Sequence, residues 1–158
     1  MAEQRRRRLA FVKTADLELW RCRPIGTIPV MDLRDNRIGP VDGLILNVPE
    51  DRPLFLVVRR DGGTPRRFLV PIGDAWFDET ERAIRVDLTP QNREAPPFDP
   101  DAFEQMSEDR AAEFERTVLA RCCPEVGFHR DGRPDYGGLS AFECPSWVRP
   151  PAGTAAKP

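Results

Sequence analysis

The chain lacks long apolar runs. A helix that crosses a membrane needs about 20 consecutive apolar residues, and no stretch of the 158-residue sequence approaches that length. The first segment, Met1–Arg8, also lacks the apolar centre that a secretory signal peptide requires. These two absences predict a protein that stays in the cytoplasm.

Cysteine and histidine are scarce, with four residues and one residue respectively. Cys122 and Cys123 are adjacent, which does not match the disulfide framework of a small secreted domain. A zinc site would have to combine these two with His129 and Cys144, but no Cys-x-x-Cys pair exists and adjacent cysteines seldom ligate one tetrahedral ion. His129 also lacks a placed acid partner for nucleophile activation. We therefore expect reduced thiols, no metal, no directly bound cofactor and no enzymatic activity.

Lysine is nearly absent, since only two of the 24 basic residues are lysine, and the formal net charge is −2. The charges are nevertheless separated along the chain. Seven basic and two acidic residues lie between Arg5 and Arg23, whereas thirteen acidic residues and four arginines lie between Asp74 and Glu115. Such a molecule can turn its basic end toward an anionic surface.

Residues 1–25 are predicted to form a basic extended arm. The arginine run 5–8 repels itself, and the apolar residues of Leu9–Val12 and Leu17–Trp20 show neither a helical nor a strand period. These apolar side chains must be covered by the domain or by a partner. The arm is either a solvated segment without a role or a contact to anionic lipid or nucleic acid. Its candidate contact residues are Arg5, Arg6, Arg7, Arg8 and Trp20.

Residues 26–98 have the pattern of a compact all-β unit, because short apolar runs alternate with turn residues at intervals of about ten residues. Asp35-Asn36 predicts the turn of a first hairpin. In the run that follows, Arg37–Asn47, Gly39 and Gly43 predict a bulge or bend that lets one strand serve two sheet edges.

Two more hairpins are predicted in the same unit. Pro53–Arg60 and Arg66–Pro71 are rich in β-forming residues and flank the turn Asp61–Pro65. Ala75–Asp78 precedes Ala83–Leu88, in which apolar and charged residues alternate, so that one face of the strand points inward. Six short strands are enough to close a small barrel.

The turns of these hairpins carry charged residues whose roles stay open. The arginines beside Asp61–Pro65 form a second basic patch, which is either a solvated hairpin tip or a contact to a partner or anionic surface. The carboxylates after Phe77 are ordinarily solvated at such a turn, and a proton-relay role would need a nearby quinone site. The patch consists of Arg59, Arg60, Arg66 and Arg67, and the carboxylates are Asp78, Glu79 and Glu81.

Residues 99–123 are predicted to be helical. Ser107 can cap a helix over Glu108–Cys122, whose first acidic residues suit the positive end of the helix dipole. Apolar residues recur every three or four positions, so one stripe packs inward while charged positions face water. The predicted inner stripe is Ala111, Phe114, Val118 and Cys122, and the predicted outer positions are Glu113, Glu115 and Arg116.

Residues 124–158 form an irregular tail that is rich in glycine and proline and carries isolated aromatic residues. Such a segment is ordered only where it lies on another surface. Its end, residues 149–158, is interpreted most simply as a disordered terminus.

Four stretches of the chain resemble a known protein family. In chain order they are Asp35–Asn47, Phe55–Val58, Phe68–Gly73 and Ala83–Thr89. Together they resemble the PRC-barrel family over about half of the chain. This family takes its name from the cytoplasmic domain of the photosynthetic reaction-centre H subunit, and a ribosome maturation factor carries the same barrel. Within the family, Leu69–Gly73 followed by Trp76–Asp78 is most similar to the reaction-centre subunit.

The resemblance implies a small PRC-type barrel over residues 26–98 in a mainly β protein with an extended N-terminal arm, one C-terminal helix and an irregular C-terminal wrap. It also implies a non-catalytic structural subunit that caps and stabilises a membrane complex. The complex implied most closely is a photosynthetic reaction centre, whose core carries bacteriochlorophyll and quinone.

Two departures from the H subunit shape this expectation. H subunits begin with a transmembrane helix, whereas this chain has none, so it is expected to dock on the reaction-centre core or on a separate transmembrane anchor at the cytoplasmic face of the inner membrane. H subunits are also associated with proton delivery to the secondary quinone through surface carboxylates and histidines. The strand Phe55–Arg60 has no carboxylate, and the candidate proton-relay groups are Asp78, Glu79 and Glu81.

An RNA- or ribosome-associated PRC-barrel module is the alternative function. The arginine run 5–8 and the second arginine patch favour it, and it predicts RNA binding that weakens steeply with salt. The acidic stretch from Asp74 to Glu115 argues against a broad nucleic-acid face.

Overall fold

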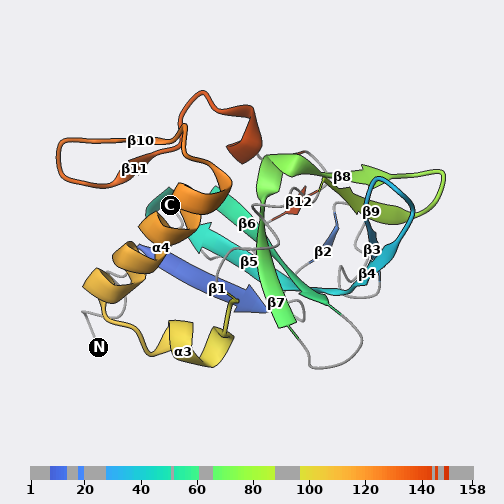
Figure 1. Cartoon of the computed structure of the whole chain (residues 1–158), viewed down its shortest axis with the longest axis horizontal. Coiled ribbons are helices and arrows are strands. Elements are labelled where there is room, and N and C mark those ends of the chain that lie inside the picture. Colours follow the sequence, from blue (N-terminus) through green and yellow to red (C-terminus); the bar gives the residue numbers. More distant parts are fainter. Residues whose placement is uncertain are drawn as a thin grey trace.

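The computed structural model describes residues 8–13, 18–19, 28–50, 52–60, 66–87, 97–143, 145 and 148–149. The predictions for Arg5, Arg6, Arg7, Trp20, the turn Asp61–Pro65 and the end of the tail lie outside these residues. Within them the protein is mainly β, with two four-stranded sheets and two α-helices (Figure 1). None of the helices in this part of the chain is both long and apolar enough to span a membrane.

The first sheet is antiparallel, and its strands follow the order β1-β5-β6-β7. The bounds are β1 Leu9–Lys13, β5 Val41–Asn47, β6 Arg52–Arg60 and β7 Arg66–Pro71. The predicted β6–β7 hairpin is therefore confirmed. Strand β1 lies in the segment predicted to be an extended arm, for which no sequence period had indicated a strand. Its residues pair with β5 from Leu9 opposite Asn47 to Lys13 opposite Gly43, and this ladder orders the segment without a strict apolar period.

The second sheet follows the order β4-β3-β9-β8, in which β3 and β9 are parallel and the other pairs are antiparallel. The predicted hairpins at Asp35-Asn36 and after Asp78 are both confirmed. The bounds are β3 Val30–Met31, β4 Arg37–Gly39, β8 Ala75–Asp78 and β9 Ala83–Val86. Two further pairs of strands are short, namely β2 Glu18–Leu19 with β12 Val148–Arg149, and β10 Gly127–Phe128 with β11 Pro134–Asp135.

The run Arg37–Asn47 divides between the two sheets, as its glycines predicted. It breaks at Pro40, which has no N–H to continue a ladder, so that β4 belongs to the second sheet and β5 to the first. The register with β6 then shifts between Val41 and Gly43. Gly43 has a second reason to be glycine, because a Cβ atom there would overlap the carbonyl oxygen of Val12 on β1.

The predicted closed barrel is not present in the strand pairing of the described residues, which gives two separate sheets. Their facing sides share one apolar core, to which the first sheet contributes Leu44, Leu56 and Val70 and the second contributes Val30 and Ile84. The described structure is thus a small β domain whose chain crosses between sheets at Pro40 and at the short 3-10 turn η4, Ile72–Asp74.

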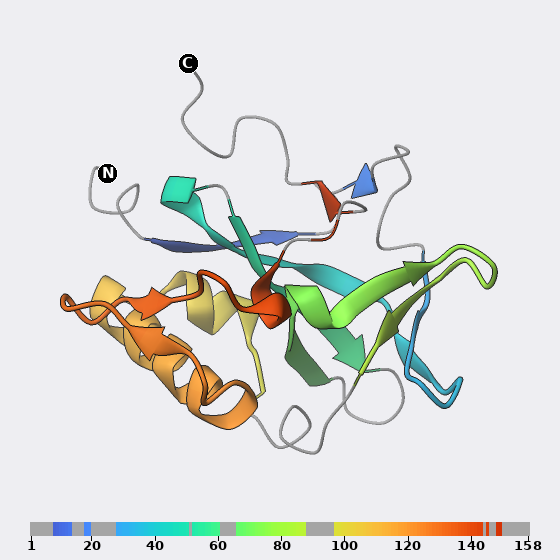
Figure 2. The ribbon, with the colours of Figure 1, turned by 90° about the horizontal axis from the view of Figure 1, so that it is seen from above.

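The other side of the first sheet is covered by helices and by the tail (Figures 1 and 2). The helices are α3 Pro100–Glu104 and α4 Glu108–Cys122, so the predicted bounds of α4 are confirmed. The Ser107 hydroxyl caps α4 by accepting the N–H of Arg110 at 3.1 Å. Because both faces of the first sheet are covered, β6 is buried without interruption from Pro53 to Val58.

The tail was predicted to need another surface, and that surface is the domain itself. Tyr136 and Phe142 are buried in the core beneath the helices, and the ring of Phe142 meets that of Phe55 edge to face at a centroid distance of 5.4 Å. Phe142 lies in the 3-10 turn η5, Ser140–Phe142, which packs so closely on η4 that a Cβ atom at Gly73 would overlap the carbonyl oxygen of Ser140.

Candidate functional site

The outer face of the second sheet carries a row of four aligned side chains. Arg37 on β4 is opposite Met31 on β3, Met31 is opposite Arg85 on β9, and Arg85 is opposite Trp76 on β8. Residues directly opposite each other in a sheet project from the same face. Ile84 and Val86 flank Arg85 and are buried on the inner face. We call this row of four residues the Trp76 face.

Trp76 is the most prominent member of the face, with 44% of its surface exposed. Three large apolar residues in the described part of the chain are exposed, and two of them belong to the second sheet and its turns, namely Trp76 and Leu33. An exposed tryptophan on a regular strand is unusual, because burial of such a ring removes a large apolar area from water and stabilises the protein. The face therefore combines an exposed aromatic ring with two arginine side chains.

Arg85 holds the face in one arrangement. Its guanidinium donates to the carbonyl oxygen of Asp32 at 3.0 Å, and it forms ion pairs with Asp35 at 2.5 Å and with Asp78 at 3.2 Å. The hydrogen bond with Asp35 is the largest of the effects that raise the pKa of Arg85. Asp32 and Asp35 lie at the β3–β4 turn and Asp78 lies at the end of β8. Arg85 on β9 therefore links this turn to β8.

The β3–β4 turn is itself rigid. The buried Asp32 carboxylate accepts the N–H of Arg34 at 2.8 Å and the N–H of Asn36 at 2.9 Å. Asp35 occupies the left-handed region with φ 64°, which aspartate tolerates better than most residues. These bonds hold Leu33, which is 55% exposed, at the tip of the turn.

The three predicted relay carboxylates cluster at the β8–β9 turn. Asp78 accepts the N–H groups of Thr80 at 3.0 Å and of Glu81 at 3.1 Å. The hydrogen bond from Glu81 N–H is the largest cause of the lowered pKa of Asp78, and Arg85 lowers it further. Asp78 is thus a fixed negative charge at neutral pH, which disfavours proton carriage there. Glu79 and Glu81 are exposed at the same turn.

The structure splits the predicted arginine patch into two pairs. Arg59 and Arg67 face each other across β6 and β7, and both form ion pairs with Asp42, which lies at 3.7 Å from Arg59. Arg60 and Arg66 face each other one position further on and are exposed. Asp42 supplies one negative charge against the four arginines, so the patch together with Asp42 carries a net charge of +3 rather than +4.

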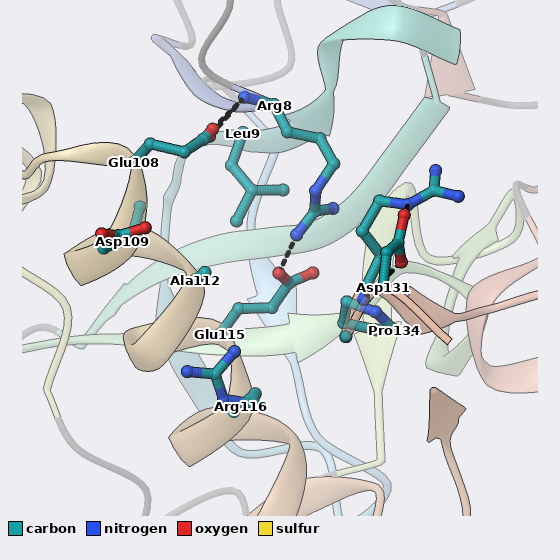
Figure 3. A pocket seen from close by; sticks show the side chains of 12 residues that line it. Arg8, Leu9, Glu108, Asp109, Ala112, Glu115, Arg116, Asp131 and Pro134 are labelled. Carbon is teal, nitrogen blue, oxygen red and sulfur yellow. Dashed lines mark hydrogen bonds and ion pairs between the residues drawn. The ribbon is translucent and has the colours of Figure 1, made fainter. Parts of the chain in front are cut away.

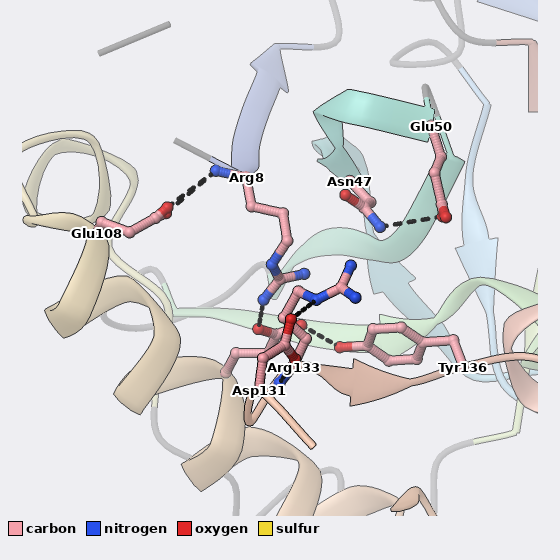
Figure 4. Close-up of polar contacts among 8 residues, drawn as sticks. Arg8, Asn47, Glu50, Glu108, Asp131, Arg133 and Tyr136 are labelled. Carbon is pink, nitrogen blue, oxygen red and sulfur yellow. Dashed lines mark hydrogen bonds and ion pairs between the residues drawn. The ribbon is translucent and has the colours of Figure 1, made fainter. Parts of the chain in front are cut away.

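Arg8 does not extend from the domain but closes a buried ion pair. Its guanidinium donates to the carboxylate of Glu115 on α4, and its backbone N–H donates to Glu108 at 3.2 Å (Figures 3 and 4). The hydroxyl of Tyr136 donates to the other oxygen of Glu115 (Figure 4). Burial is the first cause of the raised pKa of Tyr136, and the Glu115 charge is the second. This network joins the arm, the helix and the tail.

Glu115 corrects the prediction that its side chain faces water, because it is only 2% exposed. The sequence contains a signal for this burial. Glu115 lies four residues after Ala111 and three before Val118, in line with the inner stripe of the helix. A charged residue at such a position requires a partner to offset its desolvation. That partner is Arg8, whose position in space the sequence did not reveal.

The network lies beside a cleft of about 480 Å³ that opens between α4, the start of β1 and the β10–β11 turn (Figure 3). Its rim bears both signs of charge, including Arg116, Asp109 and an Asp131–Arg133 pair with a separation of 2.6 Å. These opposed charges give the cleft no preference for one class of ligand.

The thiols and the histidine do not converge. His129 lies 3.9 Å from Asp135 at the exposed β10–β11 hairpin, while Cys122 and Cys123 lie at the far end of α4. No cluster of three metal-binding side chains occurs among the described residues. Cys144 lies outside the described residues.

No family model matches the chain, and no curated protein matches it.

Proposed function

We propose that the protein is a non-catalytic PRC-barrel-type subunit that caps the cytoplasmic face of a membrane complex, most closely a photosynthetic reaction centre. The observation that carries this proposal is the exposure of Trp76 on β8. Trp76 belongs to the segment Leu69–Asp78, whose sequence resembles the reaction-centre H subunit more than the ribosomal branch of the family. A segment that carries the resemblance therefore also contains a large apolar side chain that the fold leaves uncovered.

The Trp76 face suits a rigid protein partner. Energetically dominant contact residues are enriched in tryptophan and arginine and lie on preorganised surfaces. Arg85 bonds to the carbonyl oxygen of Asp32 and to the carboxylates of Asp35 and Asp78, so its side chain is already ordered before a partner binds. Met31 and Leu33 extend the apolar area beside Trp76.

The charges of the second sheet and its turns, which surround the Trp76 face, favour a protein partner over lipid or nucleic acid. A phosphate-rich partner requires a net positive surface. The second sheet and its turns have more acidic than basic residues, namely Asp32, Asp35, Asp78, Glu79 and Glu81 against Arg34, Arg37, Arg82 and Arg85. The partner of the face is therefore a protein subunit, either the reaction-centre core or a separate membrane anchor.

A different surface of the protein would contact anionic lipid. Arg60 and Arg66 are exposed together at the end of the β6–β7 hairpin. Each arginine near an anionic membrane contributes about 1 kcal/mol, which is enough to orient a docked subunit but not to anchor it alone. Assistance with proton access to a quinone would rest on Glu79 and Glu81 rather than on Asp78, whose lowered pKa keeps it ionised.

The test is the fate of the chain when native membranes are dissolved in mild detergent and the pigment–protein complex is isolated. We expect the wild-type chain to copurify at a constant ratio to the core subunits. Trp76→Ala should weaken the association about thirty-fold, equivalent to about 2 kcal/mol, whereas Trp76→Phe should retain most of it. A wild-type chain absent from the complex would refute the proposal.

The RNA-binding alternative has one observation in its favour, the exposed Arg60–Arg66 pair. Asp42 offsets one of the two charges of Arg59 and Arg67, so the hairpin offers a phosphate backbone a basic patch smaller than four free arginines. We expect no binding of structured or single-stranded RNA in low-salt buffer. RNA binding that is lost in the double substitution Arg60→Gln and Arg66→Gln would replace the membrane-complex proposal with this alternative.

A further inference from the structure

Two neighbouring thiols meet at the end of α4. Cys122 is the last residue of the helix, and Cys123 caps it by donating its N–H to the carbonyl oxygen of Leu119 at 2.9 Å. The two sulfur atoms lie 2.9 Å from each other. Side chains of adjacent helical residues ordinarily diverge by about 100°, so the change of backbone conformation at Cys123 is what turns its sulfur toward Cys122.

We infer that Cys122 and Cys123 form a reversible redox site, at which hydrogen peroxide oxidises the two thiols to a disulfide between adjacent residues. This inference is independent of the proposed docking function, because neither cysteine belongs to the Trp76 face. It needs only the proximity of the two sulfur atoms and access to one of them.

The two cysteines differ in their access to an oxidant. Cys122 is partly exposed, whereas Cys123 is 2% exposed and belongs to the core cluster beneath the helices. The hydrogen bond with Cys122 and burial raise the pKa of Cys123, and the nearby carboxylates Glu125 and Asp74 add to this effect. Cys123 therefore remains a thiol, and Cys122 is the residue that meets the peroxide.

The reaction then proceeds in two balanced steps. The Cys122 sulfur, after losing its proton, attacks one peroxide oxygen; an S–O bond forms, the O–O bond breaks, and the released hydroxide takes up a proton to leave as water. Cys122 is now a sulfenic acid. The Cys123 sulfur attacks the Cys122 sulfur, so that the S–S bond forms, the S–O bond breaks, and the thiol proton leaves with the hydroxyl group as a second water. The two thiols lose two electrons, and the peroxide gains them.

The product should be easily reduced. Cα atoms joined by one peptide bond are about 3.8 Å apart, which is shorter than the roughly 4.4–6.8 Å that disulfides usually span. A disulfide that departs from its preferred geometry is strained and has a higher reduction potential. The site is therefore suited to reversible oxidation rather than to permanent stabilisation of the fold.

Peptide mapping of the full-length protein tests this inference directly. The reduced protein is exposed to hydrogen peroxide, denatured in an alkylating reagent and digested with trypsin. Cleavage after Arg121 and Arg130 releases residues 122–130, which contain both Cys122 and Cys123, while Cys22 and Cys144 fall in other peptides. We expect this peptide to escape alkylation and to be lighter by two hydrogen atoms, and dithiothreitol to restore both alkylation sites.

Two variants sharpen the result. Cys22→Ser should leave the oxidised peptide unchanged, because Cys22 takes no part in the reaction. Cys123→Ser should abolish the lighter peptide and leave Cys122 as a sulfenic or sulfinic acid. Recovery of residues 122–130 with both cysteines alkylated after peroxide treatment would overturn the inference, as would a disulfide from either cysteine to Cys22 or Cys144. The chain's copurification with a membrane complex is a separate readout and does not affect this outcome.

Discussion

The two sheets of the domain differ in how many of their faces are covered. The first sheet packs against the second sheet on one side and against helices and tail on the other, so β6 is buried on both faces over most of its length. In the second sheet, β9 buries Ile84 and Val86, while the outer face presents Arg85 and the exposed Trp76. The first sheet is thus covered on both faces, whereas the second sheet leaves one face open, which is the face that we propose as the contact surface.

The most severe test of this comparison truncates one aromatic residue in each sheet to alanine. Phe55→Ala should lower the free energy of unfolding by about 3–5 kcal/mol, because Phe55 is buried and contacts the ring of Phe142. Trp76→Ala, the matched control on the open face, should lower it by less than about 1 kcal/mol. Urea unfolding followed by circular dichroism measures both. Equal losses would show that the Trp76 face is part of the core and not a free surface.

The second test concerns the charge buried on the covered side of the first sheet. Glu115→Gln should lower the free energy of unfolding by about 3 kcal/mol, since it leaves Arg8 partly buried without its counter-charge. Glu113→Gln on the exposed side of the same helix is the control and should change stability by no more than about 0.5 kcal/mol. A double-mutant cycle with Arg8→Met measures the coupling, and a coupling near zero would contradict a role for the network in fastening the arm.

The third test probes the close approach of β1 to β5. Gly43→Ala should destabilise the protein by about 1–3 kcal/mol, because the added methyl group overlaps the Val12 carbonyl and lies 2.7 Å from the Phe11 ring. Gly127→Ala provides the control, since a Cβ atom there has no neighbour within 4 Å. Thermal unfolding compares the two. If Gly43→Ala melts at the wild-type temperature, β1 does not lie against β5 as closely as described.

The smallest expected effect lies on the open face. The folded-state pKa of Asp78 is lowered, so its contribution to stability is present above its unfolded pKa of about 4 and is lost as the pH falls through the folded-state pKa. Asp78→Asn should therefore remove a small stabilising contribution at neutral pH and flatten the stability profile below about pH 4, so that variant and wild type converge once Asp78 is protonated. Urea midpoints across this range provide the measurement. An unchanged acid profile would mean that water screens the contacts of Asp78 with Arg85 and with the backbone of the turn.

Several elements were predictable because short-range patterns specify them. Ser107 and the apolar repeat placed α4, and the β-forming residues on either side of Asp61–Pro65 placed the β6–β7 hairpin. Gly39 and Gly43 predicted the division of one run between two sheets. In each case the signal lies within about fifteen residues, which is the range over which caps, turns and periodicity act.

The features that the sequence did not reveal have a different origin. Leu9–Lys13 lacks a strand period and becomes a strand only because β5 provides a ladder for it. The arginine patch seemed more basic than it is, since Asp42 lies well before it in the sequence but beside it in the folded protein. The tail was predicted to be ordered only on another surface, and the sequence did not reveal that one side of the first sheet provides that surface.

The sequence by itself determined the local elements of this protein, the absence of long apolar segments, and the resemblance that directs attention to Leu69–Asp78. Only the tertiary structure decided that Trp76 stays exposed and that Arg8, Glu115 and Tyr136 meet in one buried network. The physical reason is that burial and ion pairing depend on groups brought together from distant parts of the chain. A local pattern can predict the face on which a side chain lies, but not which segment will cover that face.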